Sequence, residues 1–473
     1  MIIGRENELK MLHEAYSDEY SQFVVVYGRR RVGKTFLVRE AFNYKFTFQH
    51  SGIANAPRSS QLEEWGKSLQ KHGLKGKTTP KDWFEAFSFL DDLIRKSRAK
   101  KKVVFIDELP WMDTQASNFI PALEHFWNAY ASARKDVLLI VCGSATSWIV
   151  DKIINNHGGL HNRLNKKINL KQFTLHECEL YAKSRKLGMQ HRQLLECYMV
   201  MGGIPFYWSL LRKDLSLPQN IDSIFFSEDG ELRDEFDALY RSLFKKPEAY
   251  LSVINALGKK KIGMTRDEIS TEANLTQGGM LTTILKDLEH CGFIRKYNQI
   301  GKLSKGAMYQ LVDFYTLFYF KFILENKRHD PNFWSKSAGS SLYNNWCGLA
   351  FERVCFAHIL QIKHALSIGG VVSNEYSWFV RRTDDRPGAQ IDLLLDRGDQ
   401  TINICEIKYT SSSEFVLNEE EETKILSRRE RFIEETGTTK AVHLTLITTR
   451  GLVHNSHSDI FQNVVVAESL FEK

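Results

Sequence analysis

The sequence is poor in the residues and segments that mark several classes of protein. Only seven of its 473 residues are cysteine and nine are proline, and no two cysteines form a C-x-x-C pair. This spacing favours neither a zinc site nor a disulfide framework, so a reducing cytoplasm fits best. No apolar run is long enough to span a bilayer, and charge begins at Arg5, so we expect neither a membrane anchor nor a signal peptide.

A strong charge of one sign is also missing. Lysine and arginine number 64 against 57 aspartate and glutamate residues, which gives a formal charge of +7. That balance permits contact with nucleic acid without requiring it. The hydrophobic and charged fractions of 43% and 26% are those of an ordinary globular protein, and the sequence has no internal repeat or low-complexity segment. The length predicts roughly three domains at about 150 residues each.

The N-terminal part alternates apolar runs with helical stretches. Continuous β-branched and aromatic residues at 23–27, 103–106 and 137–142 are typical of parallel strands that are covered on both faces. A helical stretch at 82–94 lies between the first and the second of these strands. This alternation predicts a doubly wound α/β domain over residues 1–172.

The next two segments predict different architectures. Residues 175–211 have helical character, so we expect a helical lid over 173–245. Further along, Thr265 and Glu268 have the spacing of a capping box, and a second helix is expected from Thr276 to His290. Two short strands are expected to follow this helix, at 293–297 and 308–312. That order predicts a winged helix-turn-helix within residues 246–325.

The last segment, residues 326–473, shows a further α/β pattern. A helix is expected around 348–360, strands at 391–395, 402–409 and 443–448, and a charged helix that starts with the acidic run at 419–422. The aromatic stretch FYTLFYFKF at 314–322, just before this segment, is short and interrupted by a lysine, so we expect a buried helix there.

A phosphate-binding motif follows the first strand directly. The residues Gly28, Arg29, Arg30, Arg31, Val32, Gly33, Lys34 and Thr35 satisfy the Walker A pattern, and a helical sequence comes next. The two glycines let the backbone wrap closely around phosphates, whose β- and γ-oxygens the lysine reaches. The threonine hydroxyl is a ligand for Mg²⁺. We therefore expect ATP and Mg²⁺ as cofactors.

Two further strands end in residues that complement this loop. The strand at 103–106 runs into Asp107 and Glu108, the Walker B arrangement of a magnesium-binding aspartate followed by a carboxylate that polarises water. The strand at 137–142 runs into Gly143 and Ser144, which places a polar side chain between the two motifs. For Ser144 an ordinary loop position is the alternative.

These motifs resemble a known family, the archaeal-type ATPases of the AAA+/STAND-like P-loop group. The resemblance rests on IIGRENEL, YGRRRVGKT, FIDELPW, VCGSATSWI, GLHNRL and GGIPFY. It implies that Gly4, Arg5 and Glu6 lie near the nucleotide base and that Ser144 is a sensor-1 residue. It also implies that Arg163 occupies a finger-like position, for which a surface ion pair is the alternative, and that the chain forms a homo-oligomer.

A second constellation lies near the C-terminus. It consists of Glu352 on an expected helix, Asp392 in AQIDLLL, and Glu406 with Lys408 in ICEIKY. Residues two apart on a strand share a face, so this unit would place Asp392 and Glu406 on one metal ion and an ammonium group beside the attacking water. It resembles the restriction-endonuclease-like PD-(D/E)xK fold, which the ATPase family often carries here. The alternative is such a fold without cleavage activity.

Basic residues elsewhere give weaker signals. Lys259 to Lys261, with Arg295 and Lys296 near the expected wing, could contact a DNA backbone, whereas the expected recognition helix offers little positive charge. Lys100 to Lys102 are interpreted as a solvated face. The sequence thus predicts an ATP-hydrolysing protein that acts on DNA and couples nucleotide state to a nuclease-like domain. The alternative is a regulatory switch that signals through protein or DNA binding without cleavage.

Overall fold

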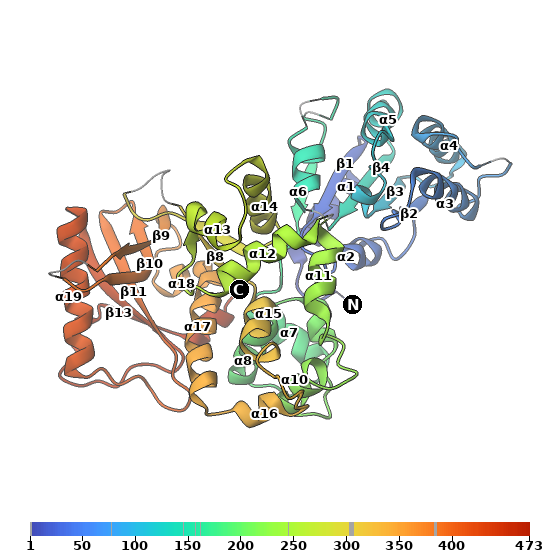
Figure 1. Cartoon of the computed structure of the whole chain (residues 1–473). Coiled ribbons are helices and arrows are strands. Elements are labelled where there is room, and N and C mark those ends of the chain that lie inside the picture. Colours follow the sequence, from blue (N-terminus) through green and yellow to red (C-terminus); the bar gives the residue numbers. More distant parts are fainter. Residues whose placement is uncertain are drawn as a thin grey trace. The chain divides into compact units, whose positions relative to one another are not determined.

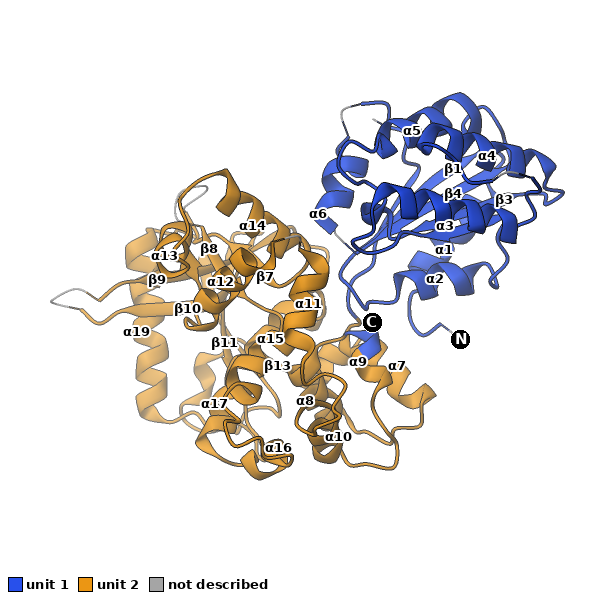
Figure 2. Ribbon diagram, turned by 45° about the vertical axis from the view of Figure 1, so that its right-hand side comes forward, with its two compact units in different colours: residues 1–172, 204–206 blue, residues 173–203, 207–473 orange. Residues whose placement is uncertain are grey.

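The computed structural model describes residues 2–473 except 77, 145, 157, 161, 245, 302–306 and 383–385. Ala145 and His161 belong to two of the motifs quoted above and lie outside the described residues. The chain divides into two compact units (Figures 1 and 2). The first unit comprises residues 1–172 with 204–206, and the second comprises residues 173–203 with 207–473.

The first unit is built around a five-stranded sheet in which every neighbouring pair is parallel. In spatial order its strands are β2 (Phe48–Ser51), β3 (Lys102–Asp107), β4 (Val137–Gly143), β1 (Gln22–Tyr27) and β5 (Lys166–Asn169). The three strands expected from the sequence are β1, β3 and β4, and together they form the buried centre of the sheet. The prediction of a parallel α/β domain is therefore confirmed.

Helices cover this sheet on both faces. They are α1 (Glu6–Ser17), α2 (Lys34–Ala41), α3 (Arg58–Lys71), α4 (Trp83–Lys96), α5 (Phe119–Phe126) and α6 (Thr146–Ile149), with shorter helical turns at Leu109–Trp111, Trp127–Ala131 and Val150–Ile154. The main core lies between the sheet and α3, α4 and α5, where Trp65, Trp83 and Phe87 are buried. Burying such a side chain stabilises the fold by about 1.5–3 kcal/mol.

The second unit starts with helices, as the sequence predicts for residues 175–211. They are α7 (Leu175–Ser184), α8 (His191–Met201), α9 (Pro205–Ser209, whose first two residues belong to the first unit), α10 (Leu217–Phe225) and α11 (Glu235–Leu243). The α7 helix begins with a capping box between Thr174 and Glu177. Such reciprocal bonds satisfy two backbone N–H groups that would otherwise lack partners.

A small antiparallel sheet with three helices follows. The elements are α12 (Pro247–Gly258), β6 (Met264–Thr265), α13 (Arg266–Glu272), α14 (Gly279–His290), β7 (Ile294–Tyr297) and β8 (Met308–Leu311), and the strand order is β6-β8-β7. Thr265 and Glu268 form the expected capping box of α13. The expected start of the next helix at Thr276 is wrong, because Gly278 is fully extended and α14 begins only after it.

A mixed five-stranded sheet occupies the C-terminal region. Its strand order is β13-β12-β11-β10-β9, with antiparallel pairs on the β9 side and parallel pairs on the β13 side. The strands are β9 (Ser373–Val380), β10 (Ala389–Arg397), β11 (Thr401–Lys408), β12 (Ala441–Thr448) and β13 (Asn463–Val466). The expected strands correspond to β10, β11 and β12.

The helices of this region are α15 (Phe314–Phe318), α16 (Phe333–Ser337), α17 (Ser341–Ala357), α18 (Ile359–Ala365) and α19 (Glu419–Thr436). The aromatic stretch at 314–322 is helical and mostly buried, as predicted. All seven cysteines are buried. Among the residues that the structure describes, no helix has the length and apolarity needed to cross a membrane.

Candidate nucleotide and metal sites

The loop between β1 and α2 has a backbone that requires glycine at its first position. Gly28 has φ 142°, and a Cβ atom there would lie 2.2 Å from the Leu170 carbonyl oxygen. Contacts below 3.0 Å to a backbone atom cannot be relieved by a side-chain movement, so no other residue fits without moving the strand beside it. Gly33, with φ 92°, is the N-cap of α2. Positive φ at both ends wraps the loop back onto the first turn of the helix.

Lys34 stands at the first turn of α2 and turns back over the loop. Its ammonium group donates to the carbonyl oxygens of Gly28 and Arg29, each at 2.8 Å, and the side chain is only 5% exposed. The free backbone N–H groups of the helix start and this ammonium group thus face the same loop. Such an arrangement favours a bound phosphate.

The other residues of the loop have separate places. Val32 is buried, and the guanidinium group of Arg31 lies 4.4 Å from the centroid of the Phe206 ring. Arg31 also has φ 70°, which is uncommon for a residue with a side chain. Arg29 and Arg30 are partly exposed. The strain at Arg31 shows that the loop is held in one conformation by its surroundings.

A chain of hydrogen bonds connects the ends of α2, β3 and β4. The Thr35 hydroxyl donates to the Asp107 carboxylate at 2.7 Å. The other oxygen of Asp107 accepts from the backbone N–H of Glu108 at 2.9 Å. The Ser144 hydroxyl then donates to the Glu108 carboxylate at 2.7 Å. The structure therefore brings together the four polar side chains that the sequence analysis selected from three separate motifs.

The backbone around Glu108 is unusual in a way that serves this geometry. Glu108 has φ 49°, a left-handed conformation that costs a residue with a Cβ atom about 1–3 kcal/mol. This turn aims its carboxylate at Ser144, which follows the adjacent strand β4. Gly143 permits the approach, because a Cβ atom there would lie 2.8 Å from the Pro110 ring. Strain of this kind at the end of a buried strand is typical of a functional site.

The residues assigned by resemblance alone lie in two places. Gly4 and Arg5 both have positive φ directly before α1. Arg5 is 6% exposed and its guanidinium group donates to the Lys171 carbonyl at 2.7 Å, so it holds the N-terminus against residue 171. Glu6 is the first residue of α1.

Arg163 lies in the exposed connection before β5. Both the finger-like position that the resemblance implies for Arg163 and the alternative of a surface ion pair stay predictions.

The C-terminal constellation converges on one pocket of about 490 Å³. Glu352 comes from α17, Asp392 from β10, and Glu406 and Lys408 from β11. The antiparallel register pairs Leu393 with Cys405. Asp392 comes directly before Leu393 on β10 and Glu406 comes directly after Cys405 on β11, so the two acidic residues are adjacent to the same cross-strand pair. Directly opposed residues have Cβ atoms about 4.5–5.5 Å apart. The topology thus unites side chains up to 56 positions apart.

Cations that the sequence analysis did not assign to this site also line the pocket. Lys261, between α12 and β6, binds Glu352 at 2.6 Å, and Arg428 of α19 binds Glu406 at 2.6 Å. Lys408 lies 3.3 Å from Glu406 and 3.2 Å from Glu421. Lys261 belongs to the lysine run for which the sequence predicts contact with a DNA backbone. No motif in the sequence indicates that Arg428 belongs to this pocket. Glu352 and Glu406 are therefore each paired with protein cations, whereas Asp392 accepts from the neutral Gln390 amide.

The charges of this pocket shift the titration of its members. Burial, with a smaller contribution from the Asp392 carboxylate, raises the pKa of Glu352 above its usual range. Burial opposes the charged form of Lys408, yet Glu406 and Glu421 hold its pKa above the usual value. Lys408 is therefore an ammonium group at neutral pH. No group of three histidine, cysteine or acidic side chains with metal-binding geometry occurs within the described part of the chain.

Comparison with known proteins identifies the N-terminal part. Residues 2–211 match the family model described as an ATPase domain predominantly from Archaea. The uncharacterised protein MJECL04 of Methanocaldococcus jannaschii is 24% identical over 416 residues, which cover 86% of this chain and 88% of that protein. The uncharacterised ATP-binding protein MJ0423 of the same organism is 36% identical over 45 residues, 10% of this chain and 76% of that one.

A solved structure has a similar fold. The Walker-type ATPase PABY2304 of Pyrococcus abyssi has a TM-score of 0.51 at 18% identity, and the match covers 67% of this chain and 95% of that chain. At this level of identity the likeness concerns the fold alone.

Proposed function

Since residues 2–211 match the model of an ATPase domain predominantly from Archaea, we propose that the chain hydrolyses ATP at the β1–α2 loop and acts on DNA. In this proposal the nucleotide state controls how the C-terminal domain meets nucleic acid. The observation that carries it is the hydrogen-bonded chain from Thr35 through Asp107 and Glu108 to Ser144. A chance Walker pattern would not place these groups in mutual contact.

In this proposal each polar residue of the phosphate site has a distinct role. Lys34 exchanges its carbonyl partners for phosphate oxygens and neutralises charge that develops on them. Glu108 takes up a proton from the attacking water, and the Ser144 hydroxyl fixes the carboxylate for that purpose. The adjacent Thr35 hydroxyl and Asp107 carboxylate suit Mg²⁺, which supplies charge neutralisation at the phosphates when bound.

Two substitutions test this assignment. Lys34→Ala removes the ammonium group, so it should abolish nucleotide binding or turnover. Glu108→Gln keeps the size but cannot accept the proton, so it should bind ATP without hydrolysing it. The measurements are phosphate release and the affinity for a fluorescent ATP analogue. Lys167→Ala and Glu63→Gln are matched controls on the surface of the same unit. Wild-type turnover in either test variant would contradict the assignment.

For the second unit we propose a winged helix-turn-helix over residues 246–325 and a restriction-endonuclease-like domain over 326–473, preceded by a helical lid over 173–245. The proposal for the last domain is supported by the shared pocket of Glu352, Asp392, Glu406 and Lys408. Asp392 and Glu406 have the oxygen ligands that Mg²⁺ or Mn²⁺ prefers, but a metal ion there competes with Arg428 for Glu406.

Cleavage of supercoiled plasmid in Mg²⁺ or Mn²⁺ tests the nuclease proposal. If the wild type cleaves no nucleic acid across a panel of metals, the domain serves binding only. The chain is then a switch that binds ATP, turns over slowly and signals through protein or DNA contacts. Turnover with single-stranded DNA, duplex DNA or no DNA separates the two functions, because DNA stimulation is expected of the DNA-acting ATPase alone.

A further inference from the structure

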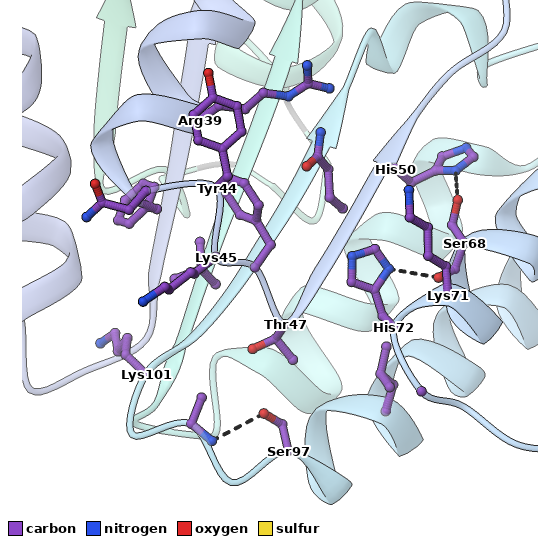
Figure 3. A pocket seen from close by; sticks show the side chains of 18 of the residues that line it. Arg39, Tyr44, Lys45, Thr47, His50, Ser68, Lys71, His72, Ser97 and Lys101 are labelled. Atoms are coloured by element: carbon purple, nitrogen blue, oxygen red, sulfur yellow. Dashed lines mark hydrogen bonds between the residues drawn. The ribbon is translucent and has the colours of Figure 1, made fainter. Parts of the chain in front are cut away.

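A broad groove runs along the free edge of the first unit's sheet, beside strand β2 (Figure 3). Its volume of about 1580 Å³ exceeds the roughly 300–1,000 Å³ typical of small-molecule pockets. One wall comes from the end of α2 and the segment 42–47, and the other comes from α3 and the residues that follow α4. Its size and open form fit a segment of a polymer.

Cations dominate the walls of the groove. The lining includes five basic side chains from four separate stretches of the chain: Arg39, Lys45, Lys71, Lys96 and Lys100. The four lysines are exposed, and within the described residues none of them forms an ion pair. The guanidinium group of Arg39 donates to a neutral partner, the amide oxygen of Gln49. The clustered cations repel one another, and a bound anion would relieve this electrostatic repulsion.

Neighbouring acidic groups offset this charge in part, because the Tyr44 hydroxyl donates to Glu40 and a single lysine, Lys67, serves both Glu63 and Glu64. Glu64, an acidic residue of the lining, is bound by Lys67 at 2.6 Å. Lys101 is buried and donates to the carbonyl oxygens of Asp18 and Tyr20, so it serves the fold. His50 is neutral at pH 7, because burial lowers its pKa to about 4.

Aromatic rings accompany the cations. Tyr44 is 57% exposed in the segment that follows α2 (Figure 3), and Tyr16 of α1, which also lines the groove, is 42% exposed. Large exposed rings usually lose free energy to water, so two of them in a basic groove suggest a stacking partner. Grooves that combine cations along a backbone with rings for bases are typical of single-strand binding.

We propose that this groove binds single-stranded nucleic acid, with phosphates on the lysines and at least one base stacked on Tyr44. An acidic peptide is the competing occupant, but lysine is depleted at protein–protein interfaces, and here four lysines line the groove. DNA and RNA share the chemistry in question, and the experiment separates them. The inference rests on the DNA-acting part of the proposed function and gives it a location.

The groove is also connected to the phosphate site. Helix α2 has eight residues and so spans about 12 Å. Lys34 and Thr35 stand at its start, whereas Arg39 and Ala41 near its end line the groove. A strand that shifts the end of α2 therefore acts on the helix that carries the phosphate-binding residues, so bound single strands should change ATP turnover.

Fluorescence anisotropy of the full chain with labelled 20-mers of dT and rU tests the proposal. In 50–200 mM KCl, each lost phosphate contact lowers the salt slope by about 0.7, so Lys71→Gln/Lys96→Gln should lower it by about 1.4. Tyr44→Ala should weaken binding about 5- to 150-fold, and Tyr44→Phe should restore it. The matched control is Lys152→Gln/Lys167→Gln, exposed lysines of the same unit away from the groove.

The outcomes distinguish the groove from the general function. If binding persists in the groove variants but is lost in Lys259→Gln/Lys296→Gln, the groove proposal fails and action on DNA stands. If no oligonucleotide binds while ATP turns over, both DNA proposals fail and the ATPase remains. Competition by polyglutamate that matches the unlabelled oligonucleotide would overturn the choice of occupant. Equal binding of dT and rU supports a site that does not read the sugar, and a preference assigns the nucleic acid.

Discussion

His358 lies at the junction of α17 and α18, where its ring is held in one tautomer. The Val354 carbonyl can only accept, so Nδ1 carries the proton and donates to it at 2.8 Å. Nε2 accepts the backbone N–H of Leu175, the first residue of α7, at 2.9 Å. A second proton on Nε2 would face that N–H group directly. Burial accordingly lowers the pKa of His358 to about 4.

This arrangement makes the stability of the second unit depend on pH. The folded pKa of about 4 lies below the unfolded value of about 6.5, so the unfolded chain binds more protons between these values. The stabilising contribution is complete above pH 6.5 and is lost as pH falls toward 4. At pH 5 the loss amounts to about 2 kcal/mol, and below both values it reaches about 3.4 kcal/mol.

Urea unfolding of His358→Gln at pH 7 and pH 5 tests this reasoning. The glutamine amide donates and accepts like the neutral ring but does not titrate. The wild type should therefore lose about 2 kcal/mol more than this variant between the two pH values. His454→Gln, a change at an exposed histidine, should behave as the wild type does. An equal loss in the wild type and His358→Gln would refute the tautomer assignment.

Further predictions concern the two candidate sites. Ser144→Ala removes a hydrogen bond to the Glu108 carboxylate, so kcat should fall by up to about 150-fold while nucleotide affinity is kept; unchanged kcat would end its sensor role. Arg163→Ala should lower turnover, and mixing it with Lys34→Ala chains should restore part of the activity if the arginine acts in trans; concentration-independent turnover by a monomer would exclude that. Asp392→Ala should abolish metal-dependent plasmid cleavage and spare ATP turnover, whereas surviving cleavage would move the metal site elsewhere.

The central strands could be predicted because their sequences carry an unambiguous physical signal. The runs that became β1, β3 and β4 are continuous and apolar, since both faces are buried. The edge strands β2 and β5 give no such signal: FQHS and KKIN are short and polar, and each pairs on one side only. Missing β2 also hid the basic groove, because the edge of the sheet determines where the groove runs.

The pairing of charges at the C-terminal site shows a second limit of sequence reasoning. The acidic residues and Lys408 could be selected because a carboxylate in an apolar strand needs a partner. Their partners could not, since Lys261 and Arg428 reach the pocket from segments that lie far away in the sequence. Lys261 looks like a solvated lysine until the fold places it 2.6 Å from Glu352. The same ion pair connects the segment between α12 and β6 directly to the pocket. A DNA phosphate that attracted Lys261 would therefore leave the buried Glu352 carboxylate without its ammonium partner.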